Sequence, residues 1–220
     1  MKYRLVAILA LLTGPVSAQQ LVPPGEIVIH VNSDVRNTKF VEPLVCALAN
    51  VVRAPVRTKK IDIALTAELL ESGTQYSPRK IVSRFAAMTA SQAELANPFH
   101  YLIVDHDLKV PDLNYVFAET YDPPASVISV TRLAPTVEPP VARKAVNEIT
   151  MPRVYKLMLK SVAVMAGLRS SSCVMMFPRS VAELDAKPAE YCSDDRAALV
   201  AARVLKEIPS TICGNVVAAR

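Results

Sequence analysis

Four cysteines have the clearest chemical potential in this sequence, because thiols can pair, bind a metal or act as nucleophiles. They are Cys46, Cys173, Cys192 and Cys213. An even number of cysteines in an exported chain is usually oxidised to disulfides, whereas the same residues in a reducing compartment more often bind metal or catalyse. Four cysteines allow three pairings, and the sequence by itself does not choose among them.

Histidines are the next candidates, because imidazole is a common metal ligand and proton carrier. The chain has three, His30, His100 and His106, and none stands four residues from another. No helix can therefore present two of them on one face to a single ion. Each lies in or beside a predicted strand, where a histidine is more often a hydrogen-bonded structural residue. A metal site regrouped from these three residues is the alternative.

Lys160 and Ser161 form a neighbouring pair of the kind that some hydrolases use as base and nucleophile. Adjacent residues on a helix point about 100° apart, so this pair is poorly placed to share a proton. We therefore do not expect a serine–lysine catalytic pair.

Residues 1–18 have the three parts of a secretory signal peptide. Two basic residues come first, residues 5–12 form the apolar core, and the small residues VSA at 16–18 form the cleavage site. The alternative is a membrane anchor, but an apolar run of about ten residues is too short to cross a hydrocarbon layer of ~30 Å. We expect cleavage after Ala18, a domain spanning residues 19–220, and a periplasmic or secreted protein.

Composition limits the rest of the chain to one compact domain. The chain has 220 residues, 51% hydrophobic and 20% charged, without low-complexity runs, which excludes a disordered chain, a coiled coil and a collagen-like repeat. The net charge of +5 is modest and no run of basic residues is interleaved with aromatic ones, so we expect no nucleic-acid partner. No other segment reaches transmembrane length, so we expect no membrane contact after signal cleavage.

The elements that must position these residues alternate between strands and helices. Apolar runs and polar–apolar alternation predict strands at 27–31, 60–65, 101–104, 115–119 and 126–131. Helical spacing predicts helices at 40–52, from Ser77-Pro78 onward, at 141–166 with a break at Pro152, and at 194–207. This order predicts an α/β (or α+β) domain.

Three segments carry a resemblance to a known family. Residues 105–119 read DHDLKVPDLNYVFAE and are followed by VISVTRL at 127–133; residues 173–177 read CVMMF; and residues 75–77 read QYS. In this order they resemble the archaemetzincins, zinc-dependent metallopeptidases of the metzincin-like zincins, over roughly residues 26–207. The resemblance implies a single metzincin-like domain with a mixed twisted sheet, flanking helices, a long active-site-type helix and a Met-turn at Met175.

The residues that the family needs for chemistry are missing. The family pattern H-E-x-x-H-x-x-G-x-x-H, placed on Gly167, puts Lys160 and Val164 at the first two histidines, Ser161 at the glutamate and Ser170 at the third histidine. An ammonium group has no lone pair to offer and valine has no donor atom. Without the ion that acidifies a bound water, no nucleophile forms. We therefore expect no catalytic residue, no metal and no other cofactor.

The resemblance also bears on the cysteines, because the family binds a second, structural zinc through four of them. Cys173 and Cys192 align with two of these ligands, while Ser171 and Asp195 stand at the other two positions. Two thiolates that share a zinc lie close enough to form a disulfide. The resemblance thus implies a Cys173–Cys192 disulfide, with the remaining two cysteines as a second bridge; a free pair is the alternative.

In metzincin-like proteins an edge strand above the active-site helix pairs with an extended peptide. By resemblance, this strand comprises Asn114, Tyr115, Val116, Phe117, Ala118, Glu119 and Thr120. An exposed strand edge can accept a peptide without any chemistry. Lys160, at the position of a zinc ligand, could face a carboxylate of such a guest, or it could extend into solvent.

These inferences predict an exported, non-catalytic pseudopeptidase that binds an extended peptide or a protein partner. One alternative is an active zinc-dependent metallopeptidase, or another hydrolase, with a site rebuilt elsewhere. Another is an inhibitor or regulator of a related enzyme, which is also a binding function.

Overall fold

A computed structural model describes residues 20–89, 97–121, 124–134 and 142–210. The predicted signal segment and Cys213 lie outside the described residues. Within these ranges, no helix combines the length and apolar character that crossing a bilayer requires.

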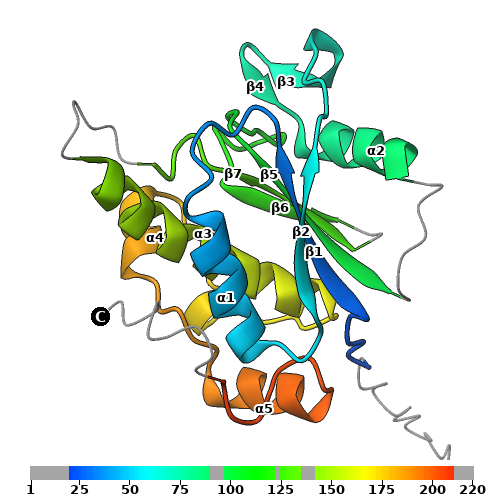
Figure 1. Cartoon of the computed structure of the whole chain (residues 1–220), viewed down its shortest axis with the longest axis vertical. Helices are drawn as coiled ribbons and strands as arrows, with labels where there is room; N and C mark the ends of the chain where they lie inside the picture. The colour runs from blue at the N-terminus through cyan, green and yellow to red at the C-terminus, as the bar shows by residue number, and fades with distance from the viewer. Residues whose placement is uncertain (1–19, 90–96, 122–123, 135–141, 211–220) are drawn as a thin grey trace, which may run out of the picture.

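The core of the domain is a five-stranded sheet in which every neighbouring pair is parallel except β6 and β7 (Figure 1). The strand order is β2-β1-β5-β7-β6, which leaves β2 and β6 at the two edges. The interior strand β1, which pairs with β2 and β5, is buried along its whole length, as its apolar run predicts for a strand covered on both faces. The strands are β1 (Glu26–Asn32), β2 (Val56–Ile61), β5 (Pro98–Val104), β6 (Ala118–Tyr121) and β7 (Ala125–Ser129).

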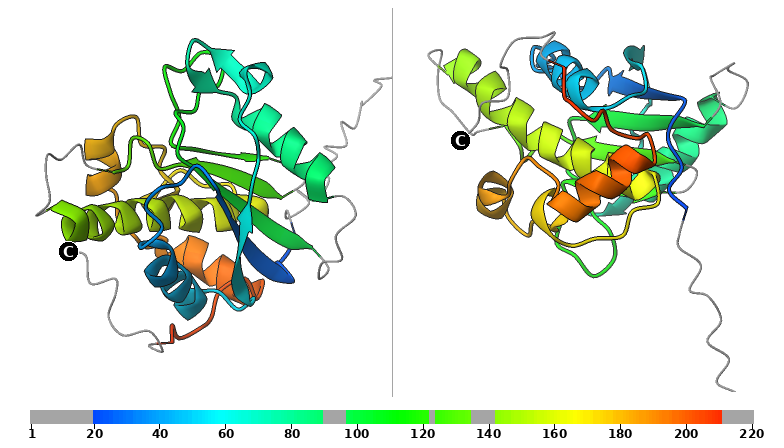
Figure 2. Two further views of the ribbon diagram at one scale, coloured as in Figure 1. Left: turned by 45° about the horizontal axis from the view of Figure 1, so that its top comes forward. Right: turned by 90° about the horizontal axis from the view of Figure 1, so that it is seen from below.

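Helices cover both faces of the sheet, so the domain has three layers (Figure 2). Helices α1 (Val41–Val51) and α3 (Ala142–Met165) pack on one face and on each other, and α2 (Pro78–Thr89) packs on the other face. Two further helices, α4 (Val181–Ala186) and α5 (Ser193–Ala201), add residues to the core under α3. Smaller elements are the hairpin β3 (Leu70–Ser72) and β4 (Gln75–Tyr76) and the short 3₁₀ turns Ala67–Leu69 and Cys173–Met175.

The predicted α/β class is confirmed, and strands β1, β5 and β7 and helices α1 and α2 lie close to their predicted positions. The strand predicted at 60–65 is misplaced, because β2 spans Val56–Ile61. This strand lies at the edge of the sheet and pairs only with β1, beginning with Val56 opposite Ile27. Its charged residues are partly exposed there, so the hydrophobic pattern does not reveal where it begins.

The strand predicted at 115–119 begins later, at Ala118. The reason is that the backbone N–H of Val116 donates to the carbonyl of Leu108, 2.9 Å away, instead of to a strand of the sheet. Residues 114–117 therefore belong to a folded-back loop that leads into the edge strand.

The helix break predicted at Pro152 is absent, because Pro152 lies inside a continuous α3. An internal proline removes a helical hydrogen bond and costs about 3 kcal/mol. The flanking residues Met151 and Val154 are buried in the core, and burying side chains of this size contributes about 1.5–3 kcal/mol each, which offsets that cost.

The last predicted helix, 194–207, ends early, at Ala201. Arg203 has a left-handed φ of 60°, the N–H of Val204 donates to the carbonyl of Leu199, and the N–H of Arg203 donates to that of Val200. This is a Schellman ending, which usually carries a glycine. Because arginine stands where glycine is usual, the sequence has no signal for the end of this helix.

Candidate functional site

A cavity of about 290 Å³ lies between the edge strand β6, helix α3 and the loop that follows the Met-turn. We call it the edge pocket. It occupies the place where the resemblance puts the catalytic zinc, because Lys160, Ser161 and Val164 line it. Its other lining residues are Phe117, Ala118, Glu119, Thr120, Leu157, Phe177 and Pro178.

Lys160 supplies a partly buried cation to this pocket. Its Nζ lies 5.1 Å from the ring centroid of Phe177, and among the described residues it has no hydrogen-bond partner. Burial lowers the pKa of Lys160, and the negative charge of Glu119 opposes this effect. The same burial raises the pKa of Glu119, against the attraction of Lys160 and Arg79. Because no described residue accepts a hydrogen bond from it, the ammonium group of Lys160 has donors available to a bound ligand.

The hydroxyl of Ser161 is bonded to residues of the sheet and not to Lys160. Its side chain is buried, and its hydroxyl lies 3.1 Å from that of Thr120 and 3.0 Å from that of Ser126. The hydroxyl of Ser126 in turn donates to the carbonyl of Glu119. This cluster joins α3 to strands β6 and β7 and leaves no hydrogen bond between Ser161 and Lys160, so the structure does not bring a serine–lysine pair together.

Strand β6 offers a row of backbone groups to the pocket. The N–H of Ser129 donates to the carbonyl of Phe117 at 2.9 Å, and the register places Ala118 opposite Ile128. Because inward and outward groups alternate along an antiparallel strand, Ala118 and Thr120 turn their N–H and C=O groups away from β7. At the pocket, the edge strand of the sheet thus comprises the four residues of β6, and residues 114–117 of the predicted edge lie before this strand.

The two rims of the pocket are joined beyond Phe117. The hydroxyl of Tyr115 donates to the carbonyl of Arg179 at 2.8 Å, linking the loop before β6 to the loop after Pro178. The guanidinium group of Arg132 lies 4.1 Å from the centre of the Tyr115 ring and holds it in place.

Arg132 is itself fixed by a carboxylate. It donates to both oxygens of Asp107, at 2.7 and 2.6 Å, and Gln75 donates to Asp107 and to the carbonyl of Asn114. Burial works against ionisation of Asp107, but the hydrogen bonds from Arg132 and Gln75 hold its pKa below the ordinary value. Asp107 thus fixes Arg132, and Arg132 in turn holds the Tyr115 ring that contacts Arg179.

The loop with Phe177 and Pro178, which lines one side of the pocket, follows directly on the turn Cys173–Met175. Met175 is buried, its turn contacts α3, and Lys187 lies against the same loop with only 2% of its surface exposed. The ammonium group of Lys187 donates to the carbonyl of Met176 at 2.9 Å. Burial, with the nearby charges of Lys160 and Lys156, lowers the pKa of Lys187 to about 7.

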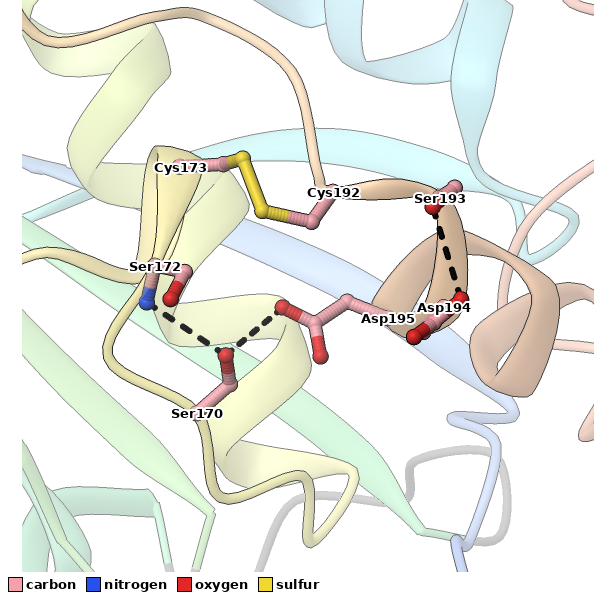
Figure 3. Close-up of a disulfide and its surroundings, with 7 residues drawn as sticks. All are labelled: Ser170, Ser172, Cys173, Cys192, Ser193, Asp194 and Asp195. Atoms are coloured by element: carbon pink, nitrogen blue, oxygen red, sulfur yellow. Dashed lines mark hydrogen bonds between the residues drawn. A yellow bond between two sulfur atoms is a disulfide. The ribbon is translucent and has the colours of Figure 1, made fainter.

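A disulfide joins the Met-turn to the start of α5. Cys173 and Cys192 are bonded, with their Cα atoms 5.5 Å apart, which confirms the predicted bridge (Figure 3). Beside it, the hydroxyl of Ser170 donates to a carboxylate oxygen of Asp195 at 2.7 Å. Cys46 is also disulfide-bonded, and its predicted partner Cys213 lies outside the described residues.

The three histidines do not converge. The rings of His30 and His100 are in contact in the sheet, with Nε2 and Nδ1 3.2 Å apart, while His106 lies 3.4 Å from Asp34 at the end of β5. Burial, together with the positive charges of His100 and neighbouring basic residues, lowers the pKa of His30 to about 3. Within the described ranges, no group of three or more His, Cys, Asp or Glu side chains could hold a metal ion.

The residues at the positions of the catalytic zinc ligands do not fit a metal. Lys160 offers an ammonium group and Val164 a hydrocarbon to the edge pocket, while the hydroxyl of Ser170 is bound to Asp195 and does not line that pocket. A zinc site needs several lone-pair donors that point to one place. The structure does not bring such donors together at these positions.

Sequence reasoning missed two features of the site. The burial of Lys187 is one, because a lysine is normally exposed and its neighbours in sequence give no sign of the loop above it. The Tyr115–Arg179 contact is the other, because it joins residues 64 positions apart. Neither feature has a local sequence signal.

Three solved structures resemble this fold. An archaemetzincin from Archaeoglobus fulgidus, complexed with malonate, is 24% identical with a TM-score of 0.59, covering 79% of this chain and 99% of its own. A zinc-dependent peptidase from Methanocorpusculum labreanum is 20% identical with a TM-score of 0.64, at the same coverage. An archaemetzincin from Methanopyrus kandleri is 23% identical with a TM-score of 0.63, covering 83% of this chain and 98% of its own.

No protein-family model and no curated protein matches the sequence. At this level of identity, the likeness to the three structures establishes the fold and leaves the activity to be argued from the residues of this chain.

Proposed function

We propose that this chain, whose fold is archaemetzincin-like, is an exported, non-catalytic module that binds an extended peptide or a protein segment in the edge pocket. The observation that carries the proposal is the set of side chains that line the pocket. Where a zinc peptidase of this fold would need metal ligands, Lys160 and Val164 line an open cavity beside a free strand edge.

The lack of suitable donors supports a function without catalysis. A metal-bound water needs the ion to lower its pKa and a base to take its proton. Lys160 and Val164 cannot coordinate an ion, and the hydroxyl of Ser161, which stands at the position of the general base, is already bonded to Thr120 and Ser126. The pocket thus has neither part of that chemistry.

The free edge of β6 supports peptide binding. The outward N–H and C=O groups of Ala118 and Thr120 can form two pairs of hydrogen bonds with a strand laid beside them. The cavity below the strand, lined by Phe117, Leu157 and Phe177, would receive the side chains of the guest. Backbone bonds give affinity in this mode of recognition, and the cavity gives selectivity.

The disulfides support export. Cys173–Cys192 closes a segment with a sequence separation of 19 residues, and Cys46 is also oxidised. Disulfides persist in the periplasm and outside the cell and are rare in reducing compartments. Together with the signal-like residues 1–18, they favour a periplasmic or secreted protein.

The test is to ask whether the oxidised chain retains peptides and whether it cuts them. Residues 19–220, produced with their disulfides intact, are incubated with a random peptide library, and retained peptides are identified by mass spectrometry with and without a chelator. We expect intact peptides and no effect of the chelator. Cleavage products that disappear with chelator would overturn the proposal in favour of a metallopeptidase.

A substitution and a modified peptide provide controls. Ala118→Pro removes an outward N–H from an edge strand, where proline is tolerated, and should abolish retention while the fold persists. Retained peptides N-methylated at alternating amides should lose binding to the unchanged protein, because they cannot form the strand pairing. Equal retention in both controls would show that β6 is not the binding edge.

A further inference from the structure

The joined rims make the edge pocket blind at one end. Tyr115 precedes the lining residue Phe117 in the loop before β6, Arg179 follows the lining residue Pro178 in the loop after the Met-turn, and the hydrogen bond between them joins these two loops next to the pocket. A peptide that runs along β6 cannot pass this point unless that contact breaks. An occupant must therefore end there or turn outward.

The closed end is fixed in advance and does not depend on a guest. The Tyr115 ring contacts both the guanidinium group of Arg132 and the ring of Phe117, whose centroid is 5.2 Å away. The two charge-assisted bonds from Arg132 to Asp107 hold that guanidinium group from the other side. Bidentate pairs of this kind fix geometry as well as adding energy.

The direction of pairing decides which end of a peptide meets the closed end. Strand β6 runs from Ala118 toward Tyr121, so its first residue lies next to Phe117 and the closed end. A peptide that pairs antiparallel with β6 runs the opposite way and points its carboxyl terminus at Phe117. Antiparallel pairing is slightly the more stable arrangement per residue.

The charge in the pocket suits such a terminus. Lys160 places its ammonium group beside Phe177, and within the described part of the chain this group has no hydrogen-bond partner. The positive charge of Lys160 is near enough to the buried Lys187 to lower the pKa of Lys187, and Lys156 acts on Lys187 in the same way. Glu119 is the carboxylate that opposes Lys160, and it is shared with Arg79.

We propose that the edge pocket selects the free carboxyl terminus of an extended peptide, whose carboxylate binds the ammonium group of Lys160 at the end closed by Tyr115 and Arg179. This inference rests on the proposed binding function. A free amino terminus would bring a second cation toward Lys160, and a chain that continues past its last pocket residue would meet the Tyr115–Arg179 contact.

The experiment compares two libraries of N-acetylated hexapeptides that have the same random sequences, one with free carboxyl termini and one amidated. We expect the oxidised protein to retain the free acids and to bind the matching amides at least about tenfold more weakly, because a buried charged partner is lost. Extension of a retained peptide by two glycines should weaken its binding by a similar factor.

The outcomes separate this inference from the function on which it rests. Equal retention of acids and amides would overturn terminal recognition and leave peptide binding standing. Enrichment of internal Asp or Glu in both libraries would show that Lys160 binds a side-chain carboxylate, and this result would also overturn terminal recognition. Retention of neither library would overturn both proposals.

Variants of this chain locate the effect. Lys160→Met should remove the difference between acid and amide, while Lys109→Met, which removes a positive charge from a loop that does not line the pocket, should preserve it. Near-ultraviolet circular dichroism checks that each variant is folded. A Lys160→Met protein that is folded and still prefers free acids would contradict the assignment of the carboxylate to this lysine.

Discussion

The disulfide region and the edge pocket occupy the two places where this chain departs from the archaemetzincin pattern, and they differ in what stands there instead of metal ligands. At the first, Cys173 and Cys192 are joined covalently, and Asp195 accepts a hydrogen bond from Ser170, the residue that aligns with the third catalytic histidine. At the second, Lys160 and Val164 line a cavity, and among the described residues no disulfide or hydrogen bond joins their side chains to another element.

The difference reflects what each site must supply. A structural site has only to hold two segments together, and any bond of sufficient strength does this, so a disulfide can take the place of a metal. A catalytic site has to aim several lone pairs at one ion while leaving a position open, and neither an ammonium group nor a hydrocarbon can do so. The fold can therefore persist in a chain that lacks the residues needed to bind a catalytic metal ion.

The largest expected effect comes from breaking the covalent link. Replacing both Cys173 and Cys192 by serine should lower the free energy of unfolding by about 3 kcal/mol, because the unfolded chain regains the freedom of the closed segment. Urea denaturation at pH 7 measures this loss. Ser170→Ala, which removes the neighbouring hydrogen bond, is the matched comparison and should cost about 1 kcal/mol. A larger loss from Ser170→Ala would show that the disulfide is not the main restraint.

A smaller effect should come from Lys187, which lies between the two regions under the Met-turn. The folded protein holds its proton only below about pH 7, whereas the unfolded chain holds it up to the ordinary pKa of 10.5. Folding thus releases a proton in this window, so the stability contribution of Lys187 rises with pH, by on the order of 2 kcal/mol between pH 7 and pH 9.

Lys187→Met should remove this rise. The measurement is urea denaturation at several pH values from 6 to 9, with Lys109→Met as the control for loss of a positive charge. If the variant and the unchanged protein show parallel pH profiles, the pKa of Lys187 is not lowered in the folded state.

The smallest effect on stability is expected at the edge pocket itself. Lys160→Met removes a partly buried cation and its contact with Phe177, which is worth about 0.5–1 kcal/mol, but also removes the cost of burying the charge. The unfolding free energy should therefore stay within about 1 kcal/mol of the original. If Lys160→Met lowers the midpoint of thermal or urea unfolding as much as the loss of the disulfide does, Lys160 is a structural residue. The two regions would then not differ in their contribution to stability.

Much of this architecture could be predicted from local patterns. The continuous apolar run at β1 is typical of a strand covered on both faces, and the spacing of apolar residues in α1 has the helical period of 3.6; both elements lie where these patterns placed them. Errors arose where a distant contact overrides the pattern. The bond from Val116 to Leu108 delays β6, and the burial of α3 carries the helix through Pro152.

The candidate site divides in the same way. Lys160 and Val164 are four positions apart, so the sequence alone places them on one face of a helix. Their side-chain types also exclude a pair of imidazole ligands for a metal at these two positions. They do not reveal that Lys160 has no hydrogen-bond partner in the part of the chain that the structure describes, or that the Ser161 hydroxyl lies against that of Thr120. Those properties depend on which strand lies opposite the helix.

The amino-acid sequence by itself determined the order of the elements and the chemistry that its side chains can and cannot perform, because both follow from residue type and short-range spacing. Only the tertiary structure decided that the pocket is closed beyond Phe117 and that a lysine lies buried under the Met-turn. These features arise from contacts between segments far apart along the chain, and such contacts form only when the packing of the whole domain brings the segments together.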